Sequence, residues 1–330
     1  MTQTSMLEVE LERLIERKLT GTTLEDRRAS IENGVAEPLV PYGEYNGFLP
    51  GESDEMDRDK AINTVRLWSF LEKTQKGVLA EWRGRGDLRT AVEKEIDRKL
   101  NNKGILDTLR QKLEVDNIEL TLYYPKPSPS DSLQSQRNFE ANEWSVTRQQ
   151  RYSKYHPGNE IDMVIFINGL PLFTIELKNP ATHQTARYDG QKQYREDRDP
   201  RDTLLKFARC LAHFTLDKDE VFFTTRLEGK NTFFMPFNQG LPNGQGAGNP
   251  INPNGHKTVY FWEKILTPDT IADIVQNFAL VDYGEAKKHK KVPHLLKNAK
   301  GLIFPRFHQL DVVNRLSDDV TTKGVGGKYL

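Results

Sequence analysis

The sequence feature that most constrains this fold is a pair of apolar runs joined by an Asn-Gly step, between residues 159 and 180. An Asn-Gly step between two apolar runs is the strongest short-range signal for a β-hairpin. Both runs are apolar at successive positions, which is typical of strands that are buried on both faces in the middle of a helix-covered sheet. We therefore predict an α/β fold with this hairpin at its centre.

Three charged residues, Asp162, Glu176 and Lys178, interrupt these apolar runs near their outer ends. Side chains alternate along a strand, so Glu176 and Lys178 share a face. A two-residue loop at 168–169 with regular pairing would place Asp162 on the opposite face, whereas a three-residue loop at 167–169 with a glycine bulge would place it beside them. Because the odd-numbered residues of both runs then form a wholly apolar face, we predict the three-residue loop.

Carboxylates at the rim of a buried sheet are costly unless they are paired or bound to a metal ion. Mg²⁺ prefers oxygen ligands, and a bound ion polarises a phosphoryl group and activates water. We therefore expect Asp162 and Glu176 to hold Mg²⁺, with Mn²⁺ as a substitute, and Lys178 to act in phosphodiester cleavage. A structural Glu–Lys pair at a strand end, with Asp162 as a solvated cap, is the alternative interpretation.

The composition limits the partners and the compartment. The 47 basic and 47 acidic residues balance, so the chain is not a globally basic nucleic-acid binder and any DNA contact requires local patches, the clearest being the lysine-rich segment 287–300. The single cysteine, Cys210, excludes an internal disulfide and fits a reducing compartment, where a buried structural thiol is expected. The sequence has no signal peptide and no long apolar run, so we expect a cytoplasmic protein without membrane contact.

Periodicity predicts further elements around the hairpin. The stripe at 7–19 predicts a helix on which Glu12 is a candidate further metal ligand, although an exposed acid is the default interpretation of such a residue. A strand over 143–152 is expected beside the Asp162 strand. The remaining predictions are a polar helix over 185–196, a helix over 204–214, a hairpin over 220–237, and a strand followed by a helix over 302–320.

At 161–162, 168–172 and 175–180 the chain resembles the PD-(D/E)xK nuclease superfamily, and more specifically the amino-terminal part of the motor and endonuclease (R) subunit of bacterial type I restriction–modification enzymes. Further similarity lies at 198–201, 304–309 and 326–330. The resemblance implies a restriction-endonuclease-like mixed sheet flanked by helices. It also implies four parts: a mostly helical region packing on the nuclease core (1–137), the core (138–240), a linker and basic connection (241–300), and the beginning of a truncated helicase-like motor (301–330).

By this resemblance, Asp162 and Glu176 ligate Mg²⁺, Lys178 is the catalytic lysine, and double-stranded DNA is cut without sequence specificity after translocation by an ATP-dependent motor. Methyltransferase (M) and specificity (S) subunits are the implied partners, in the bacterial cytoplasm. Gln309 would lie near the adenine of ATP in the full-length motor. No Walker A Gly-Lys-Ser/Thr occurs in the 330 residues, so we expect this chain not to hydrolyse ATP itself and to end short of the motor.

The chain departs from the family pattern at two places. The family carries a Gln-x-x-x-Tyr element, for which Gln193 stands at the expected distance but Asp197 occupies the tyrosine position. Gln184 and Tyr188 match the spacing but come earlier in the chain. In addition, Ile161 replaces the proline before the catalytic aspartate. Two alternative functions remain: a non-catalytic docking and DNA-guiding module, and a PD-(D/E)xK repair exonuclease, against which the motor-like segment argues.

Overall fold

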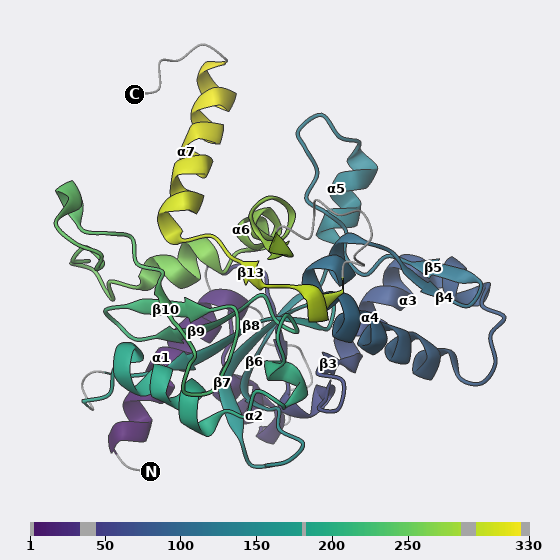
Figure 1. The fold of residues 1–330 in the computed structure, drawn as a ribbon, viewed down its shortest axis with the longest axis horizontal. Helices are drawn as coiled ribbons and strands as arrows, with labels where there is room; N and C mark the ends of the chain where they lie inside the picture. Colours follow the sequence, from purple (N-terminus) through teal and green to yellow (C-terminus); the bar gives the residue numbers. More distant parts are fainter. Residues whose placement is uncertain (1–2, 34–43, 180–182, 285–294, 325–330) are drawn as a thin grey trace.

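A mixed seven-stranded sheet forms the centre of the protein and is flanked by helices (Figure 1). The computed structural model describes residues 3–33, 44–179, 183–284 and 295–324. The strand order is β1-β6-β7-β8-β9-β10-β11, with parallel pairing at β1–β6 and β8–β9 and antiparallel pairing elsewhere. The strands are β1 (Leu49–Gly51), β6 (Trp144–Arg151), β7 (Glu160–Ile167), β8 (Leu170–Leu177), β9 (Ala212–Leu216), β10 (Val221–Thr224) and β11 (Met235–Pro236).

The predicted hairpin is β7 and β8, and its turn has two residues rather than three. Ile167 pairs with Leu170, so only Asn168 and Gly169 lie between the strands. Both have positive φ, 48° and 78°, which is the geometry of a type I′ turn. Two features require glycine at position 169: the positive φ, and the close approach of the Asn63 carbonyl oxygen, which would lie 2.2 Å from a Cβ. The predicted three-residue loop is therefore wrong.

A bulge within β8 nevertheless places Asp162 on the same face of the sheet as Glu176, which the longer loop was expected to do. Phe166 pairs with Pro171, but Ile165 pairs with Phe173, so Leu172 is an extra residue on β8. Proline has no N–H to donate to the ladder, which favours such an irregularity beside it. Beyond the bulge the register runs through the pair Met163–Ile175, and its continuation sets Asp162 opposite Glu176.

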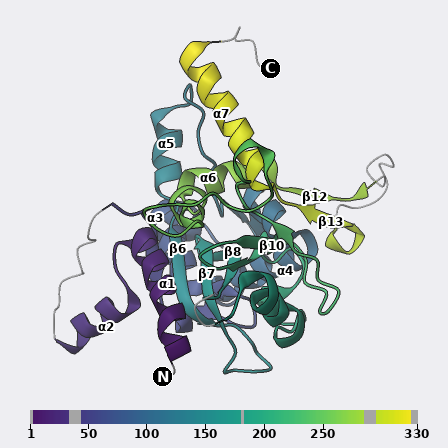
Figure 2. The ribbon, with the colours of Figure 1, turned by 90° about the vertical axis from the view of Figure 1, so that its left-hand side faces the viewer.

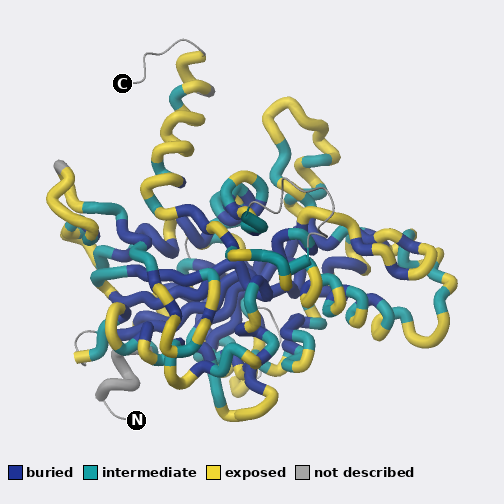
Figure 3. Tube along the Cα trace, in the orientation of Figure 1, coloured by how far each residue is buried: buried dark blue, intermediate teal, exposed yellow. Residues whose placement is uncertain are grey.

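Each face of the sheet has its own hydrophobic core. The larger core packs Met163, Ile165 and Ile175 against the helices α1, α3 and α4. The smaller core packs Val164 and Phe166 against the segment 186–205. The central strands are correspondingly buried, as predicted for strands covered on both sides (Figure 3). The helices of the larger layer are α1 (Gln3–Thr20), α3 (Thr64–Ala80), α4 (Leu88–Arg110) and α6 (Pro268–Asp273).

Smaller elements surround this framework. Figure 2 shows α2 at the edge of the molecule, next to α1, and α7 projecting away from the sheet. None of the helices in the described ranges is long and apolar enough to cross a membrane. The remaining regular elements are α2 (Leu24–Glu32), α5 (Leu133–Glu140), α7 (Phe307–Lys323) and the two-stranded pairs β2 (Met56–Asp57) with β3 (Ile62–Asn63), β4 (Leu113–Val115) with β5 (Ile118–Leu120), and β12 (Leu280–Asp282) with β13 (Gly301–Ile303).

The other predicted elements have mixed outcomes. The helix over 7–19, the strand over 143–152 beside the Asp162 strand, and the strand and helix over 302–320 are confirmed by α1, β6, β13 and α7. The helix over 204–214 is wrong. Ala208 there has φ of 58°, and the chain then forms β9, fully buried in the sheet. Of the lysine-rich segment, residues 287–294 lie outside the described ranges.

Candidate active site

Asp162 and Glu176 lie side by side on the two central strands, near the ends remote from the turn. Their closeness is fixed by a direct contact, because Oδ2 of Asp162 accepts a hydrogen bond of 2.6 Å from the backbone N–H of Leu177. Glu176 is completely buried, whereas Asp162 is partly exposed. The two carboxylates are thus neighbours, as predicted, and the site is open to solvent on the side of Asp162.

One oxygen of each carboxylate is engaged by the protein. Nε and Nη2 of Arg198 both lie 2.7 Å from Oε1 of Glu176. Oε2 of Glu176 is buried and has no hydrogen-bond partner among the described residues. A buried carboxylate oxygen without a partner is costly, which marks this position as one prepared for a ligand.

The charge of Glu176 is balanced by opposing neighbours. Burial, followed by the negative charge of Asp162, raises the pKa of Glu176 to about 8, while Arg198 and Lys178 act to lower it. Burial alone would lower the pKa of Arg198, but Glu176, together with Tyr152 and Tyr194, raises it above its ordinary value. A carboxyl group with a strongly perturbed pKa beside specific charged partners is typical of a functional site.

Lys178 follows β8 and shares the face of Glu176. Its backbone N–H donates to the Leu216 carbonyl at 2.8 Å, which continues the parallel pairing with β9. The π-helical turn η3 (Ala186–Gly190) packs closely on this end of the sheet, since a Cβ on Gly190 would lie 3.0 Å from Cβ of Thr215 and 3.5 Å from Cγ of Lys178. Lys178 is buried together with Glu176, so the two charged groups share one water-poor environment.

A chain of three buried polar groups lies behind Glu176. The hydroxyl of Tyr194, on the π-helical turn η4 (Gln193–Asp197), lies 2.6 Å from Oγ1 of Thr174, which in turn lies 2.7 Å from Nδ1 of His213. Burial, followed by the charge of Glu176, raises the pKa of Tyr194, and burial lowers the pKa of His213 to about 3. These groups are therefore neutral and position β8 and β9 without adding charge.

The Gln-x-x-x-Tyr element is replaced by a different local arrangement. Tyr188 is 72% exposed, so the pair that fits the spacing does not bring a tyrosine to Glu176. The buried tyrosine is Tyr194, directly after Gln193. Gln193 is half-buried, and its Oε1 has no hydrogen-bond partner among the described residues. No role was assigned to Tyr194 from the sequence, because the family element predicts a tyrosine four residues after a glutamine and Tyr194 directly follows Gln193.

On the side of Asp162 facing α1, Glu12 takes part in a second charged cluster. Oε2 of Glu12 lies 2.9 Å from both Nε and Nη2 of Arg148, and Nη1 of Arg148 lies 2.9 Å from Glu16 and from Glu25. Burial, followed by the charge of Asp162, raises the pKa of Glu12 to about 8. Glu12 is therefore near enough to Asp162 for their charges to interact, but its carboxylate is engaged by Arg148.

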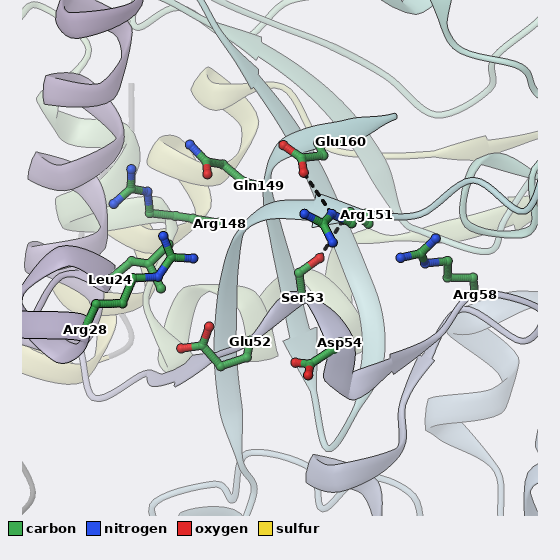
Figure 4. Close-up of a pocket in the computed structure, with 10 residues that line it drawn as sticks. All are labelled: Leu24, Arg28, Glu52, Ser53, Asp54, Arg58, Arg148, Gln149, Arg151 and Glu160. Atoms are coloured by element: carbon green, nitrogen blue, oxygen red, sulfur yellow. Dashed lines mark hydrogen bonds and ion pairs between the residues drawn. The ribbon is translucent and has the colours of Figure 1, made fainter. Parts of the chain in front are cut away.

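A cavity of about 240 Å³ lies beside this second cluster, between α2 and the open ends of β6 and β7 (Figure 4). Four arginines line it together with three acids, Glu52, Asp54 and Glu160. Arg148 and Arg151 are held in ion pairs. Arg28 and Arg58 have no acidic partner in the described ranges. The four arginines are Arg28, Arg58, Arg148 and Arg151.

The donor set fits a hard cation at Asp162 and Glu176. Both are carboxylates, and Oε2 of Glu176 is a buried oxygen with no hydrogen-bond partner among the described residues. Among the described residues, no group of three or more His, Cys, Asp or Glu side chains is arranged to hold a metal ion. Any such ion would therefore be held by these two side chains, with backbone oxygens or water completing its coordination.

Gln309 lies outside this site, whereas Arg198 belongs to it but was not predicted as a site residue from the sequence. Gln309 lies in the first turn of α7, where its Oε1 accepts a hydrogen bond from the backbone N–H of Arg306. Arg198 belongs to a stretch singled out from the sequence, yet its contact with Glu176 spans 22 residues across two π-helical turns. Local periodicity contains no signal for such a contact.

Comparison with known protein families identifies a match that covers the centre of the chain. The sequence model of a protein family described as "type I restriction enzyme R protein N terminus" matches residues 51–232. This range contains β6 to β10, together with Asp162, Glu176, Lys178 and Arg198. No curated protein matches the chain.

Proposed function

The chain belongs to the type I restriction enzyme R protein N-terminal family, and from that premise we propose that it is the Mg²⁺-dependent endonuclease part of an R subunit. Its substrate is double-stranded DNA, cut at phosphodiesters without sequence specificity after an ATP-dependent motor has translocated the DNA. Its partners are the M and S subunits of the same restriction system in the bacterial cytoplasm. The sheet and its rim of charged groups are assigned here to the PD-(D/E)xK class.

The observation that carries this proposal is the buried carboxylate of Glu176, which lies beside Asp162 and is only half-satisfied. Asp162 and Glu176 are opposite each other, each has one oxygen engaged by the protein, and Oε2 of Glu176 has no hydrogen-bond partner among the described residues. A structural ion pair would leave no such oxygen, because a buried acceptor without a partner destabilises the fold. Its presence favours a site whose last ligand is supplied on binding.

In the proposed hydrolysis, each residue of the site has a different role. Asp162 and Glu176 hold the ion, and a bound Mg²⁺ would polarise the phosphodiester and lower the pKa of an attacking water. Lys178, two residues beyond Glu176 on the same face, orients that water or offsets charge developing on the phosphorus oxygens. Tyr194, Thr174 and His213 fix β8 and β9 from behind, which keeps the groups in place.

DNA would approach from the exposed side of Asp162, next to the arginine-lined cavity. Gln149 lies between Arg148 and Gln150, whose partners on β7 flank Asp162, so the cavity wall and the carboxylate are neighbours across β6 and β7. Arg28 and Arg58 have guanidinium groups that no acid of the described ranges neutralises. Backbone phosphates bind such groups independently of sequence.

The test is a substitution in the assembled restriction complex. Glu176→Ala should abolish DNA cleavage, and Lys178→Ala should lower it by about 10²–10³-fold, the usual cost of losing one group that stabilises developing charge. ATP-driven translocation should persist in both variants, which shows that the complex is intact. Glu119→Ala, which changes an exposed glutamate on β5, is the control and should cleave normally. Cleavage at the wild-type rate in Glu176→Ala would overturn the proposal in favour of a non-catalytic DNA-guiding module.

A further inference from the structure

The two glutamates near Asp162 are both engaged by arginines, and this limits how many cations the site can accept. At Glu176, two nitrogens of one guanidinium group converge on a single oxygen, Oε1. Arg198 is itself buried, and its guanidinium carbon lies 5.7 Å from the ring centre of Tyr152. The arginine is therefore fixed by packing as well as by charge, and only Oε2 of Glu176 remains for a ligand.

On the other side of Asp162, Glu12 is the only further acid that sequence reasoning put forward as a ligand. Its Oε2 faces two nitrogens of Arg148, and that arginine is nearly inaccessible to solvent. Releasing Glu12 would leave Arg148 with Glu16 and Glu25 alone, in a place where unpaired charge is expensive. Glu12 is thus committed to the scaffold.

We propose that the site binds one divalent cation, through Asp162 and Oε2 of Glu176, and that Arg198 supplies the positive charge that a second ion would otherwise bring to Glu176. The inference rests on the proposed function, since it presupposes that the two carboxylates hold a metal ion. In this arrangement Arg198 is a positioning residue: it orients Glu176 and excludes another cation from Oε1.

The local charges agree with a single ion. Asp162 and Glu176 are countered by Lys178 and Arg198, so one divalent ion leaves the site positive toward a phosphodiester. A second ion bridging Glu176 would have to share Oε1 with a guanidinium group that already approaches it at 2.7 Å. Like charges at such separations repel strongly where water is excluded.

The number of bound ions is measured directly by titrating the chain with Mn²⁺, using calorimetry for the stoichiometry and electron paramagnetic resonance for coupling between ions. We expect one Mn²⁺ per chain with the spectrum of an isolated ion. Asp162→Asn should weaken this site, whereas Glu12→Gln, the matched control on the other side of Asp162, should still bind one ion. Two ions per chain, a spin-coupled pair, or loss of an ion in Glu12→Gln would overturn the inference.

Arg198 is tested in the assembled complex by two substitutions. Arg198→Met should lower cleavage by about 10–100-fold, as expected for a group that orients a metal ligand, and Arg198→Lys should recover part of the loss because it restores the charge. Equal activity of the Met and Lys variants would contradict the role of Arg198. Failure of Mn²⁺ to bind at all would instead contradict the proposed function, so the two failures are distinguishable.

Discussion

Asp162 lies between two arginine–glutamate clusters that look alike in composition but differ in how they are satisfied. In the first, Arg198 binds Oε1 of Glu176, and Oε2 has no hydrogen-bond partner among the described residues. In the second, Arg148 binds Glu12 together with Glu16 and Glu25. A further arginine, Arg27, lies 2.9 Å from Oε1 of Glu16. In the second cluster, both carboxylate oxygens of Glu16 and of Glu25 are thus engaged by arginines, whereas in the first cluster only one oxygen of Glu176 is.

This difference separates a binding site from a scaffold. The second cluster ties α1 to β6 through buried ion pairs and α2 through the partly exposed Glu25, so its function is to hold the helical layer on the sheet. The first cluster lies between the two central strands and retains an unused oxygen at a cost in stability. Proteins keep such costs chiefly at functional sites, which is why we place the chemistry at Glu176 rather than at Glu12.

The largest stability effect should come from the scaffold cluster. Arg148→Met leaves three acids around an apolar side chain, and breaking a buried ion pair in this way costs about 3–5 kcal/mol. The control is Arg151→Met on the same strand, whose exposed ion pair with Glu160 is worth at most about 1 kcal/mol. The free energies of unfolding in urea give the comparison. Equal, small losses in both variants would show that the Arg148 cluster does not hold the layers together.

The second prediction concerns pH. Folded Glu176, with its pKa raised to about 8, keeps a proton that the unfolded chain releases near its ordinary pKa of 4.5. The free energy of unfolding of the metal-free chain should therefore fall as the pH rises from about 5 to about 8. Glu176→Gln should reduce this fall by more than about 1.4 kcal/mol, the equivalent of one pKa unit.

Glu12→Gln sharpens the comparison, because the pKa of Glu12 is also raised to about 8. It should reduce the same pH dependence in the metal-free chain. At pH 8, however, Mn²⁺ should stabilise Glu12→Gln as it stabilises the wild type, and should not stabilise Glu176→Gln. Urea unfolding with and without Mn²⁺ measures both effects. An unchanged pH dependence in Glu176→Gln would contradict the raised pKa.

The smallest effect should come from the polar chain behind the site. Tyr194→Phe removes the hydroxyl that contacts Thr174 and should lower the free energy of unfolding by about 1 kcal/mol, the net value of one hydrogen bond. Tyr188→Phe, the exposed tyrosine at the family spacing, should change it by less than about 0.5 kcal/mol. A larger loss in Tyr188→Phe than in Tyr194→Phe would reverse the assignment of the site tyrosine.

The central hairpin could be predicted from the sequence because its signals are local. Apolar runs, the Asn-Gly step and the charged ends give two buried strands, their neighbour β6 and a shared face for Asp162 and Glu176. The three-residue loop predicted to bring Asp162 and Glu176 to one face is, however, wrong. The bulge at Leu172 supplies it, and the only local clue was Pro171, which cannot donate to the sheet.

The rest depended on tertiary contacts. The run 204–214 has apolar residues at helical spacing, yet the sheet draws residues 212–216 into β9 and so places His213 behind Thr174. The contacts of Glu176 with Arg198 and of Glu12 with Arg148 join residues 22 and 136 positions apart. No periodicity encodes such pairs, and they decide which carboxylate keeps a free oxygen.

The most direct test of the central claim is a crystal structure of the chain soaked in Mn²⁺, with the ion located by its anomalous scattering. We predict one peak within bonding distance of Oδ1 of Asp162 and Oε2 of Glu176, with Arg198 still on Oε1. A peak at Glu12, Glu16 or Glu25, or no peak at Asp162 and Glu176, would contradict the assignment of the site.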